Sequence, residues 1–296
     1  FYGSNFDETA LKNRFGVNIR RVPLTAFYKL FKSLSGKQVK DAAAKIRAMA
    51  DTVDAADEEI TRSARGYLAL RRLAEDNDCT ALAIRCWPEV RDDLLIEPCL
   101  PMALLGDEDL LCSCEADVPG LLTMMLQHAV TNGQAGPPAL LDMVSLDPGG
   151  KFAGLWHCGV SSPSLCDKGS SCICRHSIVT QNDPSAPVGL VFESAMKAGP
   201  ATLCRLQGHD AGRFLALDGK VLKRKPEFRG SYAAFQPADM SAADLVNTAM
   251  VQGLTHHYSL AYTHHAARVT EAAYWLRLAP IEPAPAHAPG ATLGRV

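Results

Sequence analysis

The chain has 296 residues, of which 47% are hydrophobic and 21% are charged, and its formal net charge is −2. This length predicts about two domains, each large enough to bury a core. The near-neutral charge argues against a nucleic-acid-binding protein, and the lack of any run approaching ~20 apolar residues argues against a membrane span. We therefore expect a soluble, globular protein with no nucleic-acid or membrane partner.

The N-terminus and the cysteines bear on the setting in which the protein works. The sequence starts FYGSNFDETALKNRFGV, without an initiator Met or a signal peptide, so we expect the chain to begin within a longer protein. Ten cysteines in a chain of this size predict reduced thiols, not a disulfide scaffold. Cys112/Cys114 and Cys172/Cys174 are spaced C-x-C, whereas C-x-x-C pairs best mark structural zinc.

The first predicted elements are two helices and a strand. Residues 37–56 and 58–76 are rich in Ala, Leu, Lys, Arg and Glu, and their apolar residues recur every three or four positions. The apolar run 79–86 lies between Asp/Asn and Trp-Pro, which is typical of a buried strand in an α/β unit. The chain therefore opens with amphipathic helices packed near a buried strand.

A βαβ unit is predicted next. Residues 110–114 predict a strand, 118–130 a helix and 139–144 a second strand, which together indicate a parallel sheet. Ligands of such sheets bind beyond the carboxyl ends of the strands, where Glu115 and Asp142 fall. We therefore expect both carboxylates to face one crevice.

From about residue 150 the composition shifts to Gly, Ser, Pro and Cys with short β-prone runs, which is typical of an antiparallel β module. The predicted elements are strands at 188–192, 201–206 and 213–217, a turn at Asp218-Gly219, and helices at 241–252 and 266–278. Residues 161–187 predict a long polar loop, of a kind that is usually functional or mobile.

Together these elements predict an α/β fold with three parts. A parallel-sheet α/β domain over 1–160 carries the candidate carboxylates. A smaller antiparallel β-barrel-like domain with flanking helices occupies 161–278. The prolines beyond it predict a Pro/Ala-rich disordered tail over 279–296.

The candidate functional residues are scattered acids and histidines, because GxGxxG, GxxxxGK[ST], GxSxG and HExxH motifs are absent. Asp117, directly before a predicted helix, is interpreted as its N-cap. Glu115 differs because it directly follows an apolar strand. Asp142 lies inside PALLDMV, where a buried carboxylate is costly unless it is paired or bound to a metal.

Three histidines complete the candidate set. His157 in LWHCG, taken alone, is interpreted as a buried core histidine. His256 and His257 are adjacent, so on a strand they would point to opposite faces and only one of them is expected at a given site. Two carboxylates and two histidines form a mixed oxygen and nitrogen set that suits Mn²⁺ or another divalent ion.

The order and spacing of several motifs resemble the L-fucose and L-arabinose isomerase family. These motifs are CEADVPGLLTMMLQHAVT, PALLDMVSLD, LWHCG, GPATLCRL and GLTHHYSLAY, and SNFDETALKNRFGVNIRRVPLTAFYKL resembles the start of the family's second domain. The resemblance extends to about residue 278 and implies that second α/β domain plus the C-terminal β domain. The resemblance also implies that the family's N-terminal domain is missing from the chain and that the protein is a cytoplasmic homo-oligomer.

The resemblance implies a role for each candidate. Glu115 matches the family's first metal-binding glutamate, and Asp142 matches its second metal-binding carboxylate. His157 resembles a histidine that arabinose-type members add to the metal shell, and His256 or His257 resembles the C-terminal metal histidine, with His257 preferred.

The implied activity is that of an intramolecular oxidoreductase that interconverts an aldose and a ketose, with a small sugar as substrate. The reaction passes through an ene-diol, so a proton must leave one carbon and reach its neighbour. In this hypothesis Glu115 and Asp142 both bind Mn²⁺, or another divalent metal, and transfer protons. The metal stabilises the charge that develops on the substrate oxygens.

Two other hypotheses stay open on the sequence. One is a non-catalytic sugar- or metal-binding homologue that keeps the isomerase scaffold. The other is a zinc-stabilised interaction module built on the C-x-C pairs, whose zinc would survive mutation of Glu115 and Asp142. Metal analysis separates the three hypotheses.

Overall fold

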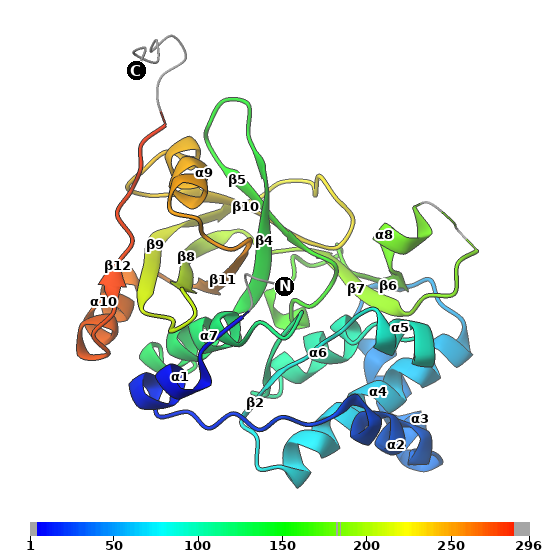
Figure 1. Ribbon diagram of the computed structural model, residues 1–296. Helices are drawn as coiled ribbons and strands as arrows, with labels where there is room; N and C mark the ends of the chain where they lie inside the picture. The colour runs from blue at the N-terminus through cyan, green and yellow to red at the C-terminus, as the bar shows by residue number, and fades with distance from the viewer. Residues whose placement is uncertain (1–4, 182, 184, 287–296) are drawn as a thin grey trace.

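The computed structural model describes residues 5–181, 183 and 185–286 and has a mixed α/β fold (Figure 1). Ten α-helices and twelve strands lie within these residues. None of the helices in this described part is both long enough and apolar enough to cross a membrane.

Five helices gather at one end of the molecule (Figure 1). They are α2 (Leu24–Ser33), α3 (Lys37–Ala48), α4 (Asp57–Asp76), α5 (Glu89–Leu94) and α6 (Cys99–Gly106). The longest, α4, has three acidic residues in its first turn, which suits the partial positive charge of a helix N-terminus. Its buried face includes Ile60, Tyr67 and Leu70 and packs against α2, α3 and α6, so one apolar core holds this end together.

A ten-stranded mixed sheet forms most of the rest, in the order β1-β6-β7-β10-β5-β4-β11-β8-β9-β12. Its strands are β1 (Thr52–Val53), β4 (Ala139–Leu146), β5 (Ala153–His157), β6 (Cys172–Arg175), β7 (Leu190–Ala195), β8 (Gly199–Gln207), β9 (Arg213–Leu222), β10 (Ser231–Pro237), β11 (His257–Tyr262) and β12 (Ala279–Pro280). Strand β10 also pairs with β9. Each of the six strands β10, β5, β4, β11, β8 and β9 therefore pairs with two others of this set. These six strands enclose a second apolar core that includes Leu141, Leu155 and Phe235.

A separate two-stranded parallel sheet, formed by β2 (Ala81–Ala83) and β3 (Leu111–Ser113), stands beside the large sheet. Helix α7 (Val118–Val130) follows β3 and contacts β2 and β3 as well as β8 and β11. Asp117 caps α7, because its Oδ1 accepts a hydrogen bond of 2.9 Å from the Gly120 N–H. The helix therefore joins the two sheets.

The remaining helices lie around the strands (Figure 1). They are α1 (Glu8–Phe15), the short 3₁₀ helix η2 (Pro163–Leu165), α8 (Ser177–Thr180), α9 (Ala242–Val251) and α10 (Ala266–Trp275). Helix α9 contacts β4, β5 and β10, whereas α10 contacts β8 and β9. Helix α8 follows β6 directly and has no buried residue.

The structure confirms the mixed α/β class and most of the predicted elements. The helix predicted over 118–130 has those bounds, and the helix predicted over 58–76 is α4. The strands predicted at 79–86, 110–114 and 139–144 are β2, β3 and β4. Local periodicity was therefore a sound guide to the type of most elements. The helix predicted over 37–56, however, ends at Ala48, and Thr52–Val53 form β1.

The predicted parallel pairing of residues 110–114 with residues 139–144 is wrong. Strand β4 pairs antiparallel with β5 and β11, and β3 pairs with β2. A tight turn at Asp147–Gly150 explains this, since the Gly150 N–H donates to the Asp147 carbonyl at 2.7 Å and β4 folds straight back onto β5. Residues 139–157 thus share a sheet with the strands beyond residue 160, and the division into domains stays a prediction.

Three other expectations need correction. Residues 161–187 were expected to be a long loop, but they contain β6, which pairs with β1 and β7. Asp218 and Gly219 lie within the continuous strand β9, not in a turn. The tail was expected to be disordered from residue 279, but β12 pairs with β9 and Ile281 is buried. Residues 287–296 lie outside the described part.

Replacing Gly189 by Ala should destabilise the fold by about 3 kcal/mol or more, because overpacking against backbone leaves no side chain to move aside. A Cβ atom at Gly189 would lie 2.0 Å from the Glu97 nitrogen, where the link between α5 and α6 crosses the start of β7. Urea unfolding measures the change. Gly149→Ala is the control, since its Cβ would meet only side chains, the Asp147 carboxylate at 3.0 Å and Lys151 at 3.9 Å. Equal stability of the two variants would contradict this packing.

Candidate metal centre

Three of the predicted ligands converge on neighbouring strands of the large sheet. On β4, Asp142 lies directly opposite His257 of β11, while His157 is the last residue of β5. One potential ligand atom from each of these residues lies within 4.8 Å of the other two. Asp142 Oδ1 and His257 Nε2 are 3.3 Å apart.

Glu115 and His256 approach the same place from the other side. His256 Nε2 lies 3.6 Å from Glu115 Oε2 and 3.8 Å from Asp142 Oδ1. Glu115, His256 and His257 also form a group whose potential ligand atoms lie within 4.8 Å of one another. All five residues predicted from the sequence are thus brought together.

The expectation that only one of the paired histidines reaches a given site was wrong. Strand β11 begins at His257, so His256 precedes the regular alternation of side chains. The His256 carbonyl accepts a hydrogen bond of 3.1 Å from the Met143 N–H, and the two imidazole rings lie 4.2 Å apart between centroids. Both histidines therefore face the same carboxylates.

Glu115 is held in an unusual backbone conformation. Glu115 and Ala116 both lie in the left-handed region, with φ of 56° and 53°. Such conformations are uncommon for residues other than glycine and cluster where the surrounding structure enforces them, often at functional sites. The Ala116 N–H donates to the Ile84 carbonyl at 3.0 Å, which anchors this turn to the end of β2.

The centre is buried on one side and open on the other. The His257 side chain is 3% exposed, Asp142 17% and His256 53%. His256 lowers the pKa of Glu115, and Glu115 raises the pKa of His256, as expected for opposite charges in contact. The open edge at Glu115 and His256 is where a small molecule can enter.

Three buried atoms of this centre have no hydrogen-bond partner: Asp142 Oδ1, His157 Nε2 and His257 Nε2. Leaving a buried polar atom unpaired costs about 1–3 kcal/mol, so three at one point call for an explanation. A carboxylate oxygen and imidazole nitrogens suit a divalent cation such as Mn²⁺. His157 Nε2 can bind the cation only when the ring proton is on Nδ1, the atom that here accepts a hydrogen bond of 2.9 Å from the Cys158 N–H. The residues present therefore fit a metal ion.

Asp117 determines which nitrogen of His257 faces the centre. Its Oδ2 lies 2.9 Å from His257 Nδ1 and 2.6 Å from Arg205 Nη1. Because an ionised carboxylate only accepts hydrogen bonds, Nδ1 carries the proton, and in the neutral ring Nε2 is left as a ligand. Burial alone would raise the pKa of Asp117, but the Arg205 guanidinium and His257 hold that pKa below its usual range.

Arg205 was not anticipated, and Asp117 was anticipated only as a helix cap. The cap is confirmed, yet the same carboxylate also binds Arg205 and orients His257. Both partners of the ion pair are 1% exposed. The signal in the sequence was an arginine inside the apolar run ATLCRL, which needs a buried anion as its partner.

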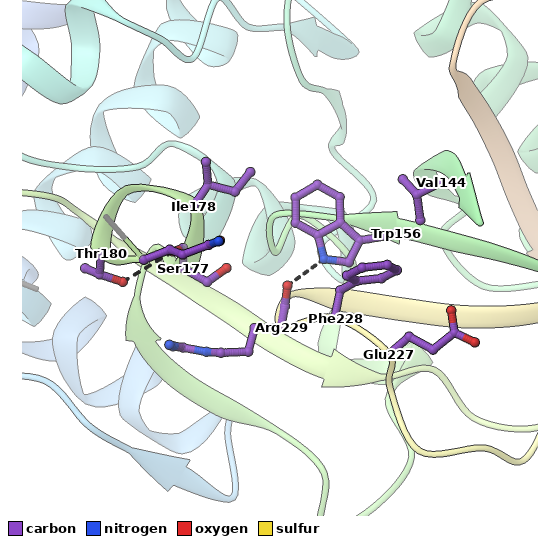
Figure 2. Close-up of a pocket in the computed structure, with 9 residues that line it drawn as sticks. Val144, Trp156, Ser177, Ile178, Thr180, Glu227, Phe228 and Arg229 are labelled. Carbon is purple, nitrogen blue, oxygen red and sulfur yellow. Dashed lines mark hydrogen bonds between the residues drawn. The ribbon is translucent and has the colours of Figure 1, made fainter. Parts of the chain in front are cut away.

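A pocket of about 610 Å³ lies beside the centre (Figure 2). Its lining residues are Val144, Trp156, Ser177, Ile178, Thr180, Gln181, Glu227, Phe228 and Arg229. Trp156 lies opposite Asp142 across β4 and β5, so the pocket adjoins the metal centre. Figure 2 shows Trp156 between Val144 and the residues of α8, with its Nε1–H donating to the Arg229 carbonyl at 2.5 Å. The segment 161–187 thus supplies one wall.

No protein-family model matches the chain. Three curated proteins that are similar to the chain are all named as isomerases. Each is named sulfoquinovose isomerase. The protein from Priestia megaterium is 25% identical over 263 residues, which cover 88% of this chain and 57% of the relative. The protein from Alkalicoccus urumqiensis is 27% identical over 278 residues, 92% of this chain and 59% of the relative. The one from Clostridium sp. is 29% identical over 204 residues, 67% of this chain and 43% of the relative. The chain therefore spans less than three fifths of the length of these proteins.

Asp117→Asn should lower the free energy of unfolding by about 3–5 kcal/mol, because it leaves the buried Arg205 charge without its counter-ion. Urea unfolding, monitored by circular dichroism, measures the change in the free energy of unfolding. The matched control is Asp210→Asn, which removes a partly exposed ion pair with Arg14 and should cost less than about 1 kcal/mol. A similar small effect at both positions would show that the Asp117 pair is not structurally required.

Proposed function

We propose that this chain carries the catalytic centre of an aldose–ketose isomerase that depends on a divalent metal ion. The observation that supports it best is the convergence of three unpartnered buried ligand atoms, from Asp142, His157 and His257, beside Glu115. The names of the curated relatives support the reaction class. The resemblance to L-fucose and L-arabinose isomerases, noted in the sequence, supports the same ligand set.

Glu115, Asp142, His157 and His257 would hold the ion, with His256 at the exposed edge of the site. When bound, a divalent cation supplies Lewis-acid stabilisation of the charge that develops on substrate oxygens. We favour Mn²⁺, because it accepts both carboxylate and imidazole ligands.

The side chains account for the proton transfer. Isomerisation takes a proton from one carbon and returns it to the neighbouring carbon, so an acceptor and a donor must flank the substrate. Glu115, with its lowered pKa, is ionised and able to accept the proton. Asp142 supplies the second carboxylate. His256, within 3.8 Å of both carboxylates, links them and is placed to relay a proton between them.

For the substrate we propose a sugar that carries a sulfonate group, as the name sulfoquinovose denotes. The pocket beside the centre contains groups that suit this anion, since Arg229 contributes a cation and Ser177 contributes a hydroxyl donor. Arg229 Nε donates to Glu193 at 3.1 Å, which holds the guanidinium at the pocket. Hydrogen bonds from a cation to an anion are about twice as strong as neutral ones, so a sulfonate gains most from this wall.

Neutral sugars of the fucose and arabinose type are the alternative substrates. Assembly into a homo-oligomer and a cytoplasmic location stay predictions of the family resemblance.

Asp142→Asn should abolish stoichiometric Mn²⁺ binding and lower turnover by roughly 10³-fold, within the range that acid–base catalysis contributes. The amide keeps the shape of the side chain but removes the charge that the cation requires. The variant and the wild-type natural protein are compared in two measurements. Metal content after dialysis measures the binding, and ketose formation from a panel of aldoses measures the turnover. Asp239→Asn changes an exposed carboxylate and should leave both unchanged.

Full metal content and full turnover in Asp142→Asn would refute the proposed centre. Mn²⁺ binding by the wild-type protein without turnover of any aldose would instead favour a non-catalytic binding homologue.

Arg229→Gln should raise KM for sulfoquinovose about tenfold and leave kcat, and the turnover of a neutral aldose that the protein isomerises, nearly unchanged, because only the sulfonated sugar needs the cation. Steady-state kinetics with both sugars measure the difference. The control is Lys223→Gln, which removes a positive charge from an exposed side chain in the same link between β9 and β10. It should leave KM unchanged for both sugars. Equal losses for both sugars would contradict a sulfonate subsite, although not the metal centre.

A further inference from the structure

Four thiols lie next to one another outside the carboxylate and histidine ligands. Cys86 follows β2, Cys114 follows β3, Cys99 begins α6 and Cys158 follows β5. Their sulfur atoms form a continuous series, with Sγ–Sγ distances of 3.1 Å from Cys86 to Cys114, 3.8 Å from Cys114 to Cys99 and 3.4 Å from Cys99 to Cys158. Four segments that are distant in the sequence thus place their sulfur atoms next to one another.

The spacing of three of these sulfurs matches a metal site. In a tetrahedral thiolate site with Zn–S bonds of about 2.3 Å, the sulfurs lie about 3.8 Å apart. The sulfur atoms of Cys99, Cys114 and Cys158 all lie within 4.8 Å of one another. The Cys86 sulfur lies 3.1 Å from that of Cys114 but outside this group. It must therefore move by about 1 Å or more toward Cys99 and Cys158 to complete the tetrahedron.

The surroundings suit an anionic thiolate cluster. Cys86, Cys99 and Cys114 are buried, and Cys158 is partly buried. Imidazoles approach the cluster at Cys158, where His157 Nδ1 lies 3.1 Å from the sulfur and the buried His176 also faces it. The His176 side chain, which interacts with Cys158, is thus placed to donate a hydrogen bond to a thiolate there.

We propose that Cys86, Cys99, Cys114 and Cys158 form a tetrathiolate site for a soft metal ion such as Zn²⁺, separate from the carboxylate–histidine centre. Thiolates select soft or borderline ions, whereas a set with carboxylates suits Mn²⁺, so the two sites take different metals. Binding releases the thiol protons to solvent. Of the C-x-C cysteines, only Cys114 belongs to this site.

The position of the site gives it a structural role. Cys114 directly precedes Glu115, and Cys158 directly follows His157. A metal held by these cysteines would therefore tie the turn after β3 to the end of β5, two of the backbone segments that carry ligands of the neighbouring centre. Cys99 adds α6 to the same cross-link.

The test is metal analysis of the natural protein, purified in reductant without chelator. We expect about one zinc per chain that Asp142→Asn retains and that Cys99→Ser/Cys114→Ser reduces at least tenfold. The matched control is Cys112→Ser/Cys204→Ser, which changes two buried thiols outside the cluster and should retain the zinc. Zinc retained by the cluster variant, or lost from the control alone, would overturn the proposal.

Substitution with Co²⁺ keeps the proposal testable if the cluster variant does not fold. Co²⁺ added to the metal-free wild-type protein should produce the sulfur-to-metal charge-transfer absorption and the intense visible bands of a tetrahedral thiolate site. Absence of these bands, or a disulfide between Cys86 and Cys114 found by mass spectrometry of protein purified without reductant, would refute the site. Neither result depends on the isomerase activity.

Discussion

The arrangement of the centre depends on one buried carboxylate, that of Asp117. It caps α7, neutralises Arg205 of β8 and accepts a hydrogen bond from the Nδ1–H of His257 on β11. A buried ion pair gains stability from further hydrogen bonds, and the Asp117 carboxylate makes two of them, one with the Gly120 N–H and one with His257, a candidate ligand. The helix, two strands and the orientation of one imidazole are therefore coupled through a single side chain.

The other ligands reach the centre from different parts of the fold. Glu115 comes from the end of the two-stranded sheet, whereas Asp142 and His157 come from adjacent strands of the large sheet. Helix α7 contacts both sheets and so determines how far apart these two groups lie. A centre assembled in this way is sensitive to core packing, because a small shift of α7 changes the distance between Glu115 and Asp142.

Local patterns predicted the elements better than their partners. The 118–130 helix follows from its apolar periodicity and its cap, but an apolar run such as 139–144 does not specify whether its neighbours are parallel or antiparallel. Residues 172–175 lack a strong strand signal, and they form β6 because β1 and β7 flank them. The five candidate ligands came from the order of motifs, whereas the register that places Asp142 opposite His257 is a property of the folded sheet.

Helix α8 differs from the rest of the pocket wall in how it is held. Strand β6, just before it, is paired on both sides, whereas α8 is a single turn without a buried residue. Segments with few buried contacts open locally at a small fraction of the global unfolding free energy. The amides of α8 should thus exchange with solvent deuterium well before those of β6, and one side of the pocket is able to yield to an incoming molecule while the ligand-bearing strands stay in place.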